Sequence, residues 1–525
     1  MQPKHFQFGG GAAGTVLHPL VAIGMLIAVV LILILPRKRA ISPFLAAFLL
    51  IHPAQVLVLG GVHFIMQQIL ILTVLARMAA FQGSSSEKRF AGGFTTLDWV
   101  VALWSLSYFI IFSMQYMDMQ AVIKSLGDLV INLGGYLAIR FMIPDRATFQ
   151  RTLKTLAVIC VILAPCMLFE QRTGQNVFGL FGAVPPEIRE GHIRAGGVMG
   201  ALGSGAFAGV LIPLFIWLWT EPKSRMSALA GLAGASAVVF ATQSSTSWLA
   251  YGAGLLGLGL WTLRQRMRVV RWGLVIVLLG LHIVMHGPVW SLIEKIDLTG
   301  GSSNYHRYML VDNCIRHFGD WWLLGSKSYG DWGFVMFDVC NQFVLNALRG
   351  GLLTLVIYIA IYKCGFAAIG RARKRVNGDR SQELLLWCLG SVLFATVVAS
   401  FGINFTVQLM ILFSCLLAGI VAATRAAKRA TPPKADAPGT QLASASVSDV
   451  DGADLTVSAT HLSIMVPQSN EGCSPWVPFG GHVSVTYHTF WNRLSVSPFV
   501  LHRSRRSPLP LTTVPDEQRI ILSGQ

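Results

Sequence analysis

The residues best suited to chemistry gather in one polar stretch of an otherwise apolar chain. The stretch covers residues 302–330 and reads SSNYHRYMLVDNCIRHFGDWWLLGSKSYG. Its arginines, Arg307 and Arg316, suit phosphate, because a guanidinium stays charged at any physiological pH and binds phosphate oxygens in pairs. Trp321 and Trp322 have flat faces that suit sugar rings and also the bilayer interface. We interpret the stretch as a surface for a substrate that carries both phosphate and sugar.

Groups able to accept a proton accompany these arginines. Four aspartates supply possible bases: Asp312, Asp320, Asp331 and Asp338. A shared metal ion is not expected, because His306 and His317 would lie about 16 Å apart along a helix and no HExxH spacing occurs. The sequence therefore predicts acid–base chemistry with no metal and no other cofactor.

Residues 305–318 are expected to form one amphipathic helix, read at about 100° per residue. Its apolar face would carry Tyr308, Val311, Ile315 and Phe318. Its polar face would carry His306, Asn313 and His317, with an arginine on each flank. Such a helix is expected to lie on the membrane surface or to cover a cavity.

A third arginine precedes a segment rich in glycine and alanine that is expected to be helical. Arg194 opens the segment IRAGGVMGALGSGAFAG, residues 193–209, whose small residues allow close helix packing. A positive charge at a helix N-terminus is poorly placed, because the helix dipole favours anions there. A phosphate bound by Arg194 would resolve this mismatch, and an arginine that reaches toward the membrane interface is the alternative.

The rest of the chain predicts a polytopic membrane protein. Of its 525 residues, 54% are hydrophobic and only 12% are charged, whereas a soluble domain carries about 25% charged residues. About thirteen apolar segments approach the length of a membrane-spanning helix. They are 16–35, 41–59, 62–80, 97–117, 121–143, 153–170, 197–220, 227–245, 247–263, 271–288, 341–362, 383–401 and 404–423. The predicted fold is an all-α bundle of about 12–13 transmembrane helices.

Charge predicts the orientation of this bundle. The net charge is +17, in short clusters between apolar runs, which is typical of cytoplasmic loops and does not predict a nucleic-acid partner. If the first residue lies outside, the basic loops all fall in the cytoplasm: 36–39, 84–89, 144–154, 221–225, 264–271, 370–380 and 424–429. The long loops 171–196 and 289–340 then lie outside, where Cys314 and Cys340 could form a disulfide.

Several segments need separate interpretations. The apolar run 16–35 precedes Arg37, Lys38 and Arg39, the order of an uncleaved anchor. Residues 41–80 contain His52-Pro53, so they can form two spans or one re-entrant segment. Residues 1–425 form the predicted transmembrane domain. Residues 426–525, which begin rich in Pro, Ala, Ser and Asp, are expected to be a disordered cytoplasmic tail.

This layout resembles the O-antigen ligase and O-antigen polymerase superfamily over roughly residues 16–425. Those proteins have about a dozen membrane helices and one large periplasmic loop late in the chain. Arg307, the segment FGDWWLLG at 318–325, and Asn341 before a helix with Gly350-Gly351 follow the family's motif in order. Arg194 resembles the family's second arginine. The histidine that the family places before the asparagine is Cys340 here, and DVCNQFV looks closer to exopolysaccharide polymerases of the xanthan type.

The resemblance implies metal-independent glycosyl transfer at the periplasmic face of a bacterial inner membrane. The donor would be an oligosaccharide repeat unit on undecaprenyl pyrophosphate. Arg194, Arg307 and Arg316 would hold the pyrophosphate, Asp338 or His306 would take the acceptor proton, and Trp321, Trp322 and Asn341 would contact sugar. Further expected partners are the bilayer, a chain-length regulator and export proteins.

Other functions remain open. A ligase would transfer the finished glycan to lipid A core or to a protein, instead of joining repeat units. A transporter for the same lipid would use ionisable groups inside the membrane. Lys124 and Asp128 are four residues apart and can pair on one helix face, whereas Arg140 is expected to reach toward the interface. A membrane scaffold or sensor is the third alternative.

Overall fold

The computed structural model describes residues 15–81, 89–189, 191–285, 287–295, 303–333, 336–376 and 379–430. Helices dominate these residues, and each predicted apolar segment contains helix over at least part of its length. They are α1 (Pro19–Ile34), α2 (Ile41–Leu50), α3 (Met66–Ala79), α4 (Thr96–Tyr116), α5 (Met119–Leu129), α6 (Gly135–Met142), α7 (Arg146–Thr173), α8 (Gly200–Trp219), α9 (Arg225–Thr242), α10 (Ser245–Gly259), α11 (Met267–Val284), α15 (Gln342–Arg373), α16 (Arg380–Ser400) and α17 (Val407–Ala430).

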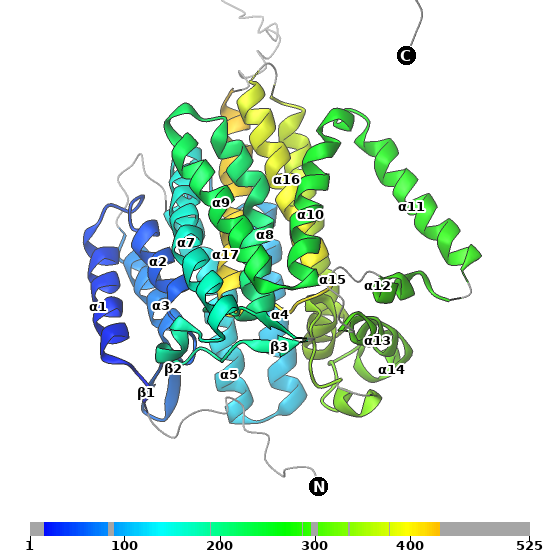
Figure 1. Cartoon of the computed structure of the whole chain (residues 1–525), viewed down its shortest axis with the longest axis horizontal. Coiled ribbons are helices and arrows are strands. Elements are labelled where there is room, and N and C mark those ends of the chain that lie inside the picture. The colour runs from blue at the N-terminus through cyan, green and yellow to red at the C-terminus, as the bar shows by residue number, and fades with distance from the viewer. Residues whose placement is uncertain are drawn as a thin grey trace, which may run out of the picture. The chain divides into compact units, whose positions relative to one another are not determined.

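These helices make the chain a multi-pass membrane protein with an all-α fold. Among the described residues, nine helical segments are long and apolar enough to cross a membrane, and α5 and α6 form one of them through the π-helical turn Val130–Gly134. The three N-terminal helices α1–α3 are apolar but shorter. Figure 1 shows the helices running side by side in a bundle, with α11 standing apart. No residue of α11 is buried.

The segments predicted at 41–59 and 62–80 are helical only in part. Helix α2 ends at Leu50, and residues 56–65 form an antiparallel hairpin of β1 (Val56–Leu59) and β2 (Val62–Ile65). Gly60 and Gly61 both have positive φ, which a tight two-residue hairpin turn requires. The residues VLVLGGVHFI therefore form strands instead of the predicted membrane helix, because β-branched residues favour strands and the glycines favour a turn. Helix α3 starts only after this hairpin.

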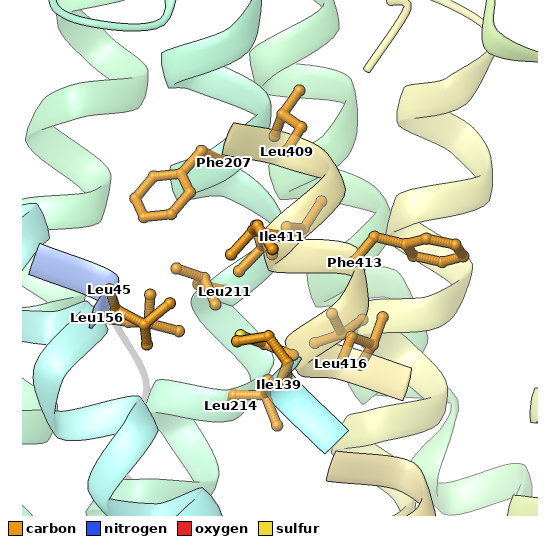
Figure 2. Packing of buried hydrophobic residues seen from close by; sticks show 14 of the residues in the cluster. Leu45, Ile139, Leu156, Phe207, Leu211, Leu214, Leu409, Ile411, Phe413 and Leu416 are labelled. Atoms are coloured by element: carbon orange, nitrogen blue, oxygen red, sulfur yellow. The ribbon is translucent and has the colours of Figure 1, made fainter. Parts of the chain in front are cut away.

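Helices α8 and α17 occupy the centre of the bundle. Figure 2 shows Phe207, Leu211 and Leu214 of α8 near Ile411 and Leu416 of α17, with Leu156 of α7 beside them. Small residues let α8 approach α10 closely, because a side chain on Gly205 would collide with Ser247. This contact holds the start of α10 against the first turns of α8.

Charged side chains also lie inside the bundle. The prediction that Arg140 reaches toward the interface is wrong, because its side chain is 1% exposed and its Nε lies 3.3 Å from Oδ1 of Asp98. Tyr136 donates to the same carboxylate. The predicted pair of Lys124 and Asp128 is confirmed, with 2.7 Å between Nζ and Oδ2.

The polar segment between α11 and α15 contains short helices. They are α12 (Leu292–Lys295), α13 (Ser303–Arg316) and α14 (Phe318–Trp321), and Figure 1 shows α13 and α14 together beside one end of α15. Helix α17 continues to Ala430, so the segment predicted as a tail from 426 begins inside a helix. Residues 431–525 lie outside the described residues.

Candidate functional site

Arg307 lies on the buried face of α13. The predicted helix 305–318 matches α13 (Ser303–Arg316), but the face that is buried differs from the one expected. The side chains buried from this helix include Asn304, Arg307, Leu310 and Cys314, whereas Ile315 is 48% exposed. The expected face is wrong because the bundle supplies polar partners for Arg307, so an arginine takes a position where an apolar residue would be the default.

Two groups accept hydrogen bonds from Arg307. Its Nη1 donates to Oδ1 of Asn304 at 2.6 Å, and its Nη2 donates to the hydroxyl of Thr246 at 2.8 Å. The thiol of Cys340 lies beside the guanidinium and is a weak acceptor. The buried Nε makes no hydrogen bond within the described part of the chain. All these partners are neutral, so they leave the charge of Arg307 uncompensated.

Arg194 reaches the same region from a different part of the chain. It ends the hairpin of β3 (Glu187–Arg189) and β4 (His192–Arg194). Its Nη1 donates to Glu187 at 2.9 Å, and its buried Nε has no hydrogen-bond partner among the described residues. Its side chain is about as well buried as that of Arg307, at 9% exposure, whereas its acidic partner is 59% exposed.

A buried carboxylate fixes the turn that follows Arg194. The two oxygens of Glu170, at the end of α7, accept hydrogen bonds from the amides of Gly196 and Gly197 at 2.9 Å each. The hydroxyl of Ser204 donates to the carbonyl of Gly196 at 2.7 Å. Together these bonds set the direction in which the chain leaves Arg194 and enters α8.

The structure brings two of the three predicted arginines together, Arg194 and Arg307. Burial lowers the pKa of Arg307, and the thiol of Cys340 opposes this, but the positive charges of Arg194 and Arg189 lower it further. Burial likewise lowers the pKa of Arg194. Arginines that repel one another in a poorly hydrated place are stabilised by an anion, so this cluster has the charge expected of an anion site.

The start of α10 adds two hydroxyl groups to the same region. Thr246, which contacts Arg307, lies in the first turn of α10, and Ser244 is its N-cap. The Ser244 side chain is 1% exposed, and its hydroxyl has no hydrogen-bond partner among the described residues. The positive charge of Arg307 interacts unfavourably with the dipole at the N-terminus of α10. A phosphate bound between Arg307 and this N-terminus would interact favourably with the arginine and with the dipole. We define the anion cluster as Arg194, Arg307, Ser244 and Thr246.

Of the two predicted bases, His306 is the one whose side chain makes a hydrogen bond that indicates its tautomer. Its Nε2 lies 2.8 Å from the backbone carbonyl of Asp338. A carbonyl only accepts, so Nε2 carries the proton, and the neutral ring then has its lone pair on Nδ1. The carboxylate of Asp338 is itself exposed. Asp338 therefore orients His306 through its main chain, and Nδ1 is left able to accept a proton.

The other predicted residues are held by separate contacts. Arg316, whose side chain is 70% exposed, forms an ion pair with Asp312 at 2.6 Å on α13. Trp321 is buried and donates to the carbonyl of Cys314 at 2.7 Å, whereas Trp322 is 47% exposed. Asn341 is the N-cap of α15 and accepts from the amides of two following residues. Cys314 and Cys340 are both free thiols.

A break in α15 anchors the loop that carries the tryptophans. Gly351 has φ +64° and ψ −172°, which interrupts the helix. The amide of Leu352 donates to the carbonyl of Trp322 at 2.8 Å, and the amide of Ser326 donates to the carbonyl of Leu348 at 2.9 Å. The loop therefore satisfies the backbone groups that the break exposes, as irregular backbone within a membrane requires.

Sequence reasoning missed the residues that complete the cluster. Ser244 and Thr246 belong to TQSSTS at 242–247, a polar run between two apolar segments, and this interruption was the available signal. Glu170 gave only a weak signal, as one acid at the end of an apolar helix. Among the described residues, no group of three or more His, Cys, Asp or Glu side chains is arranged to hold a metal ion.

Comparison with known proteins adds no family assignment. No protein-family model matches the chain, and no curated protein matches it.

Proposed function

We propose that the protein joins lipid-linked oligosaccharide repeat units into a polysaccharide at the periplasmic face of a bacterial inner membrane. The observation that carries this proposal is the anion cluster, in which Arg194 and Arg307 are buried together at the start of α10 with Nε atoms that lack a described partner. A pyrophosphate on a lipid carrier has the charge and the membrane location that suit such a cluster. Arg316 is left out of the proposed site, because it pairs with Asp312.

In the proposed reaction, an acceptor hydroxyl attacks the anomeric carbon of the donor sugar. A new carbon–oxygen bond forms, the bond to the pyrophosphate breaks, and the pyrophosphate leaves with the electron pair. Arg194 and Arg307 stabilise the negative charge that develops on the leaving group. His306 takes the hydroxyl proton on Nδ1, which its hydrogen bond to the Asp338 carbonyl leaves free to accept. Trp322 is the exposed aromatic face offered to sugar.

A ligase would use the same donor and the same cluster but a different acceptor. A transporter for the lipid is a second candidate from another class. It is favoured by the ion pair of Lys124 and Asp128 within α5 and by the break in α15 at Gly351, because transporters place charges and interrupted helices inside the membrane.

Deletion of the gene separates the three functions. Surface and secreted polysaccharide would be resolved on a gel, and lipid-linked sugars would be extracted from each side of the membrane. Loss of long polymer, with single repeat units still reaching the outer side, supports a polymerase. Full-length polymer that stays on its lipid carrier indicates a ligase. Single units that build up only on the cytoplasmic side contradict the enzyme and indicate a transporter.

A further inference from the structure

A second group of charges lies inside the membrane-spanning helices, away from the anion cluster. Helix α4 packs against both α5 and α15. Lys124 and Asp128 of α5 form an ion pair, and their side chains remain 29% and 27% exposed. Arg349 of α15 donates to the hydroxyl of Tyr108 on α4 at 3.1 Å, and Asp128 is close enough to Arg349 to interact electrostatically. These residues form one polar group among three helices.

The group lies in the first three turns of its helices. Helix α5 begins at Met119 and α15 at Gln342. At 1.5 Å per residue, Lys124, Asp128 and Arg349 then lie about 8, 14 and 10 Å along their helices. The spanning segments Met119–Met142 and Gln342–Arg373 have 24 and 32 residues, so both are longer than the hydrocarbon core of about 30 Å, and their first turns fit the interfacial region where lipid head groups lie.

Lys124 does not simply reach toward the membrane surface. Its ammonium pairs with Asp128, which lies one turn deeper in α5, and it also lies 5.2 Å from the ring of Phe112. A snorkelling lysine would instead extend toward the nearer end of its helix. The ammonium is therefore held beside Asp128 and Phe112, and its side chain remains 29% exposed.

The loop after α14 adds a third cation. Lys327 lies 4.9 Å from the ring of Tyr116 on α4. The amide of the preceding residue, Ser326, donates to the carbonyl of Leu348, which precedes Arg349. The loop is thus bonded to α15 through Ser326, and it places Lys327 beside the last residue of α4. We define the second charge group as Lys124, Asp128, Lys327 and Arg349, with Tyr108 and Tyr116 beside them.

The charges of this group do not balance. Three cations accompany one carboxylate, and Asp128 already pairs with Lys124. Arg349 donates to a neutral phenol, and in the described ranges no carboxylate lies within ion-pair distance of it. Asp128 is shared between Lys124 and Arg349, so the excess positive charge of the group favours an anion. The phenolic hydroxyls of nearby tyrosines are additional hydrogen-bond donors for it.

We propose that this second charge group binds the phosphate head group of an anionic lipid that lies in the bilayer beside α5. The lipid chain would run along the exposed face of α5, and the phosphate would bridge Arg349 and Lys124, with Lys327 closing the site from the loop. The site is distinct from the anion cluster, and the proposal does not rest on the proposed polymerase reaction. It concerns binding alone, so its test needs no catalytic assay.

Native mass spectrometry of the detergent-purified full chain tests the site. The probes are phosphatidylglycerol, phosphatidylcholine with the same acyl chains, and inorganic phosphate. We expect the wild type to retain phosphatidylglycerol at least tenfold more strongly than phosphatidylcholine. We expect Arg349→Gln to remove this preference, whereas Arg316→Gln keeps it, because that exposed arginine pairs with Asp312 outside the group. Inorganic phosphate at the concentration of the lipid should not displace it.

Three results would overturn the proposal. They are an Arg349→Gln variant that keeps the preference, a wild type that binds both lipids equally, and displacement by equimolar inorganic phosphate, which would point to a free anion instead of a lipid. Each variant is first checked for a wild-type elution profile and melting temperature. If Arg349→Gln fails to fold, Lys327→Gln serves in its place, since that side chain is exposed and lies in a loop. It should weaken the preference about threefold, and an unchanged preference would count against the site.

Discussion

The Nη2 atom of Arg307 lies 2.8 Å from the hydroxyl of Thr246, a residue 61 positions earlier in the chain. This bond ties α13 to the first turn of α10. It also fixes a guanidinium at a helix N-terminus, where a positive charge is unfavourable without an anion between the two. The contact is therefore the main structural argument for the proposal that the anion cluster binds a pyrophosphate.

The Thr246 hydroxyl should matter more than the volume of the side chain. Thr246→Val keeps the shape but removes the acceptor from Arg307, so we expect polymer formation to fall by about tenfold, the effect of losing about 1.4 kcal/mol. Thr246→Ser keeps the hydroxyl and should stay within about threefold of wild type. Equal loss in both variants would mean that packing, not the hydrogen bond, is what the site needs.

Cys340 stands where the resembling family has a histidine, but it should not act as the base. Burial is the main cause that raises the pKa of this thiol from 9.0 to about 11, so it is protonated at neutral pH. We expect Cys340→Ser to keep polymer formation within about twofold of wild type, whereas His306→Ala should lose most of it. A Cys340→Ser variant without activity would contradict the assignment of His306.

The same thiol predicts a dependence of stability on pH. A group whose pKa is higher in the folded state binds its proton more tightly there, so its contribution is complete below pH 9 and is lost as pH rises to about 11. Between these values the melting temperature of the wild type should fall relative to that of Cys340→Ser, which has no titrating group there. Parallel melting curves across this range would contradict the prediction.

Glu170 should stabilise the turn after Arg194. Glu170→Gln replaces one carboxylate oxygen with an amide that cannot accept from a glycine N–H, and we expect a loss of about 2 kcal/mol in the free energy of unfolding. The matched change Glu187→Gln affects a 59% exposed side chain and should cost less than about 1 kcal/mol. Thermal unfolding of the two purified variants measures both losses of stability. Equal losses would contradict the claim that Glu170 stabilises the turn after Arg194.

The break in α15 should require glycine at one position. A side chain on Gly351 would meet the carbonyl of Leu323, and its φ of +64° disfavours any other residue. We expect Gly351→Ala to cost at least about 2 kcal/mol. Gly370→Ala, in the same helix with no atom within 4 Å of the added carbon, should be neutral or stabilising by up to about 1 kcal/mol. A wild-type melting temperature for Gly351→Ala would show that the break is not needed.

The sequence was most informative where a local pattern decides the structure. Long apolar runs marked the helices, because a membrane leaves an apolar chain few other choices. The hairpin at 56–65 was missed because its apolar residues suit strand and helix equally, and only Gly60-Gly61 indicated a turn. The buried face of α13 depends on Thr246, which sequence spacing does not connect to Arg307.

The arginines of the cluster were predicted from residue chemistry, but their surroundings were not. Arg194 and Arg307 were expected to share a phosphate, and the structure places them within electrostatic reach of each other. Arg316 was expected with them, yet it lies on the same helix in an ion pair with Asp312. Spacing along one helix could not distinguish Arg307 from Arg316. The difference lies in their partners, because Arg307 donates to Thr246 of α10, whereas Arg316 pairs with Asp312.

The most direct test compares these two arginines in a strain that lacks the gene. The deletion would be complemented with wild type, Arg307→Ala or Arg316→Ala, each checked for equal amounts in the membrane, and long-chain polysaccharide would be measured on a gel. The account predicts no long polymer with Arg307→Ala and near wild-type polymer with Arg316→Ala. Wild-type polymer from Arg307→Ala would contradict the central claim that the buried arginine holds the leaving pyrophosphate.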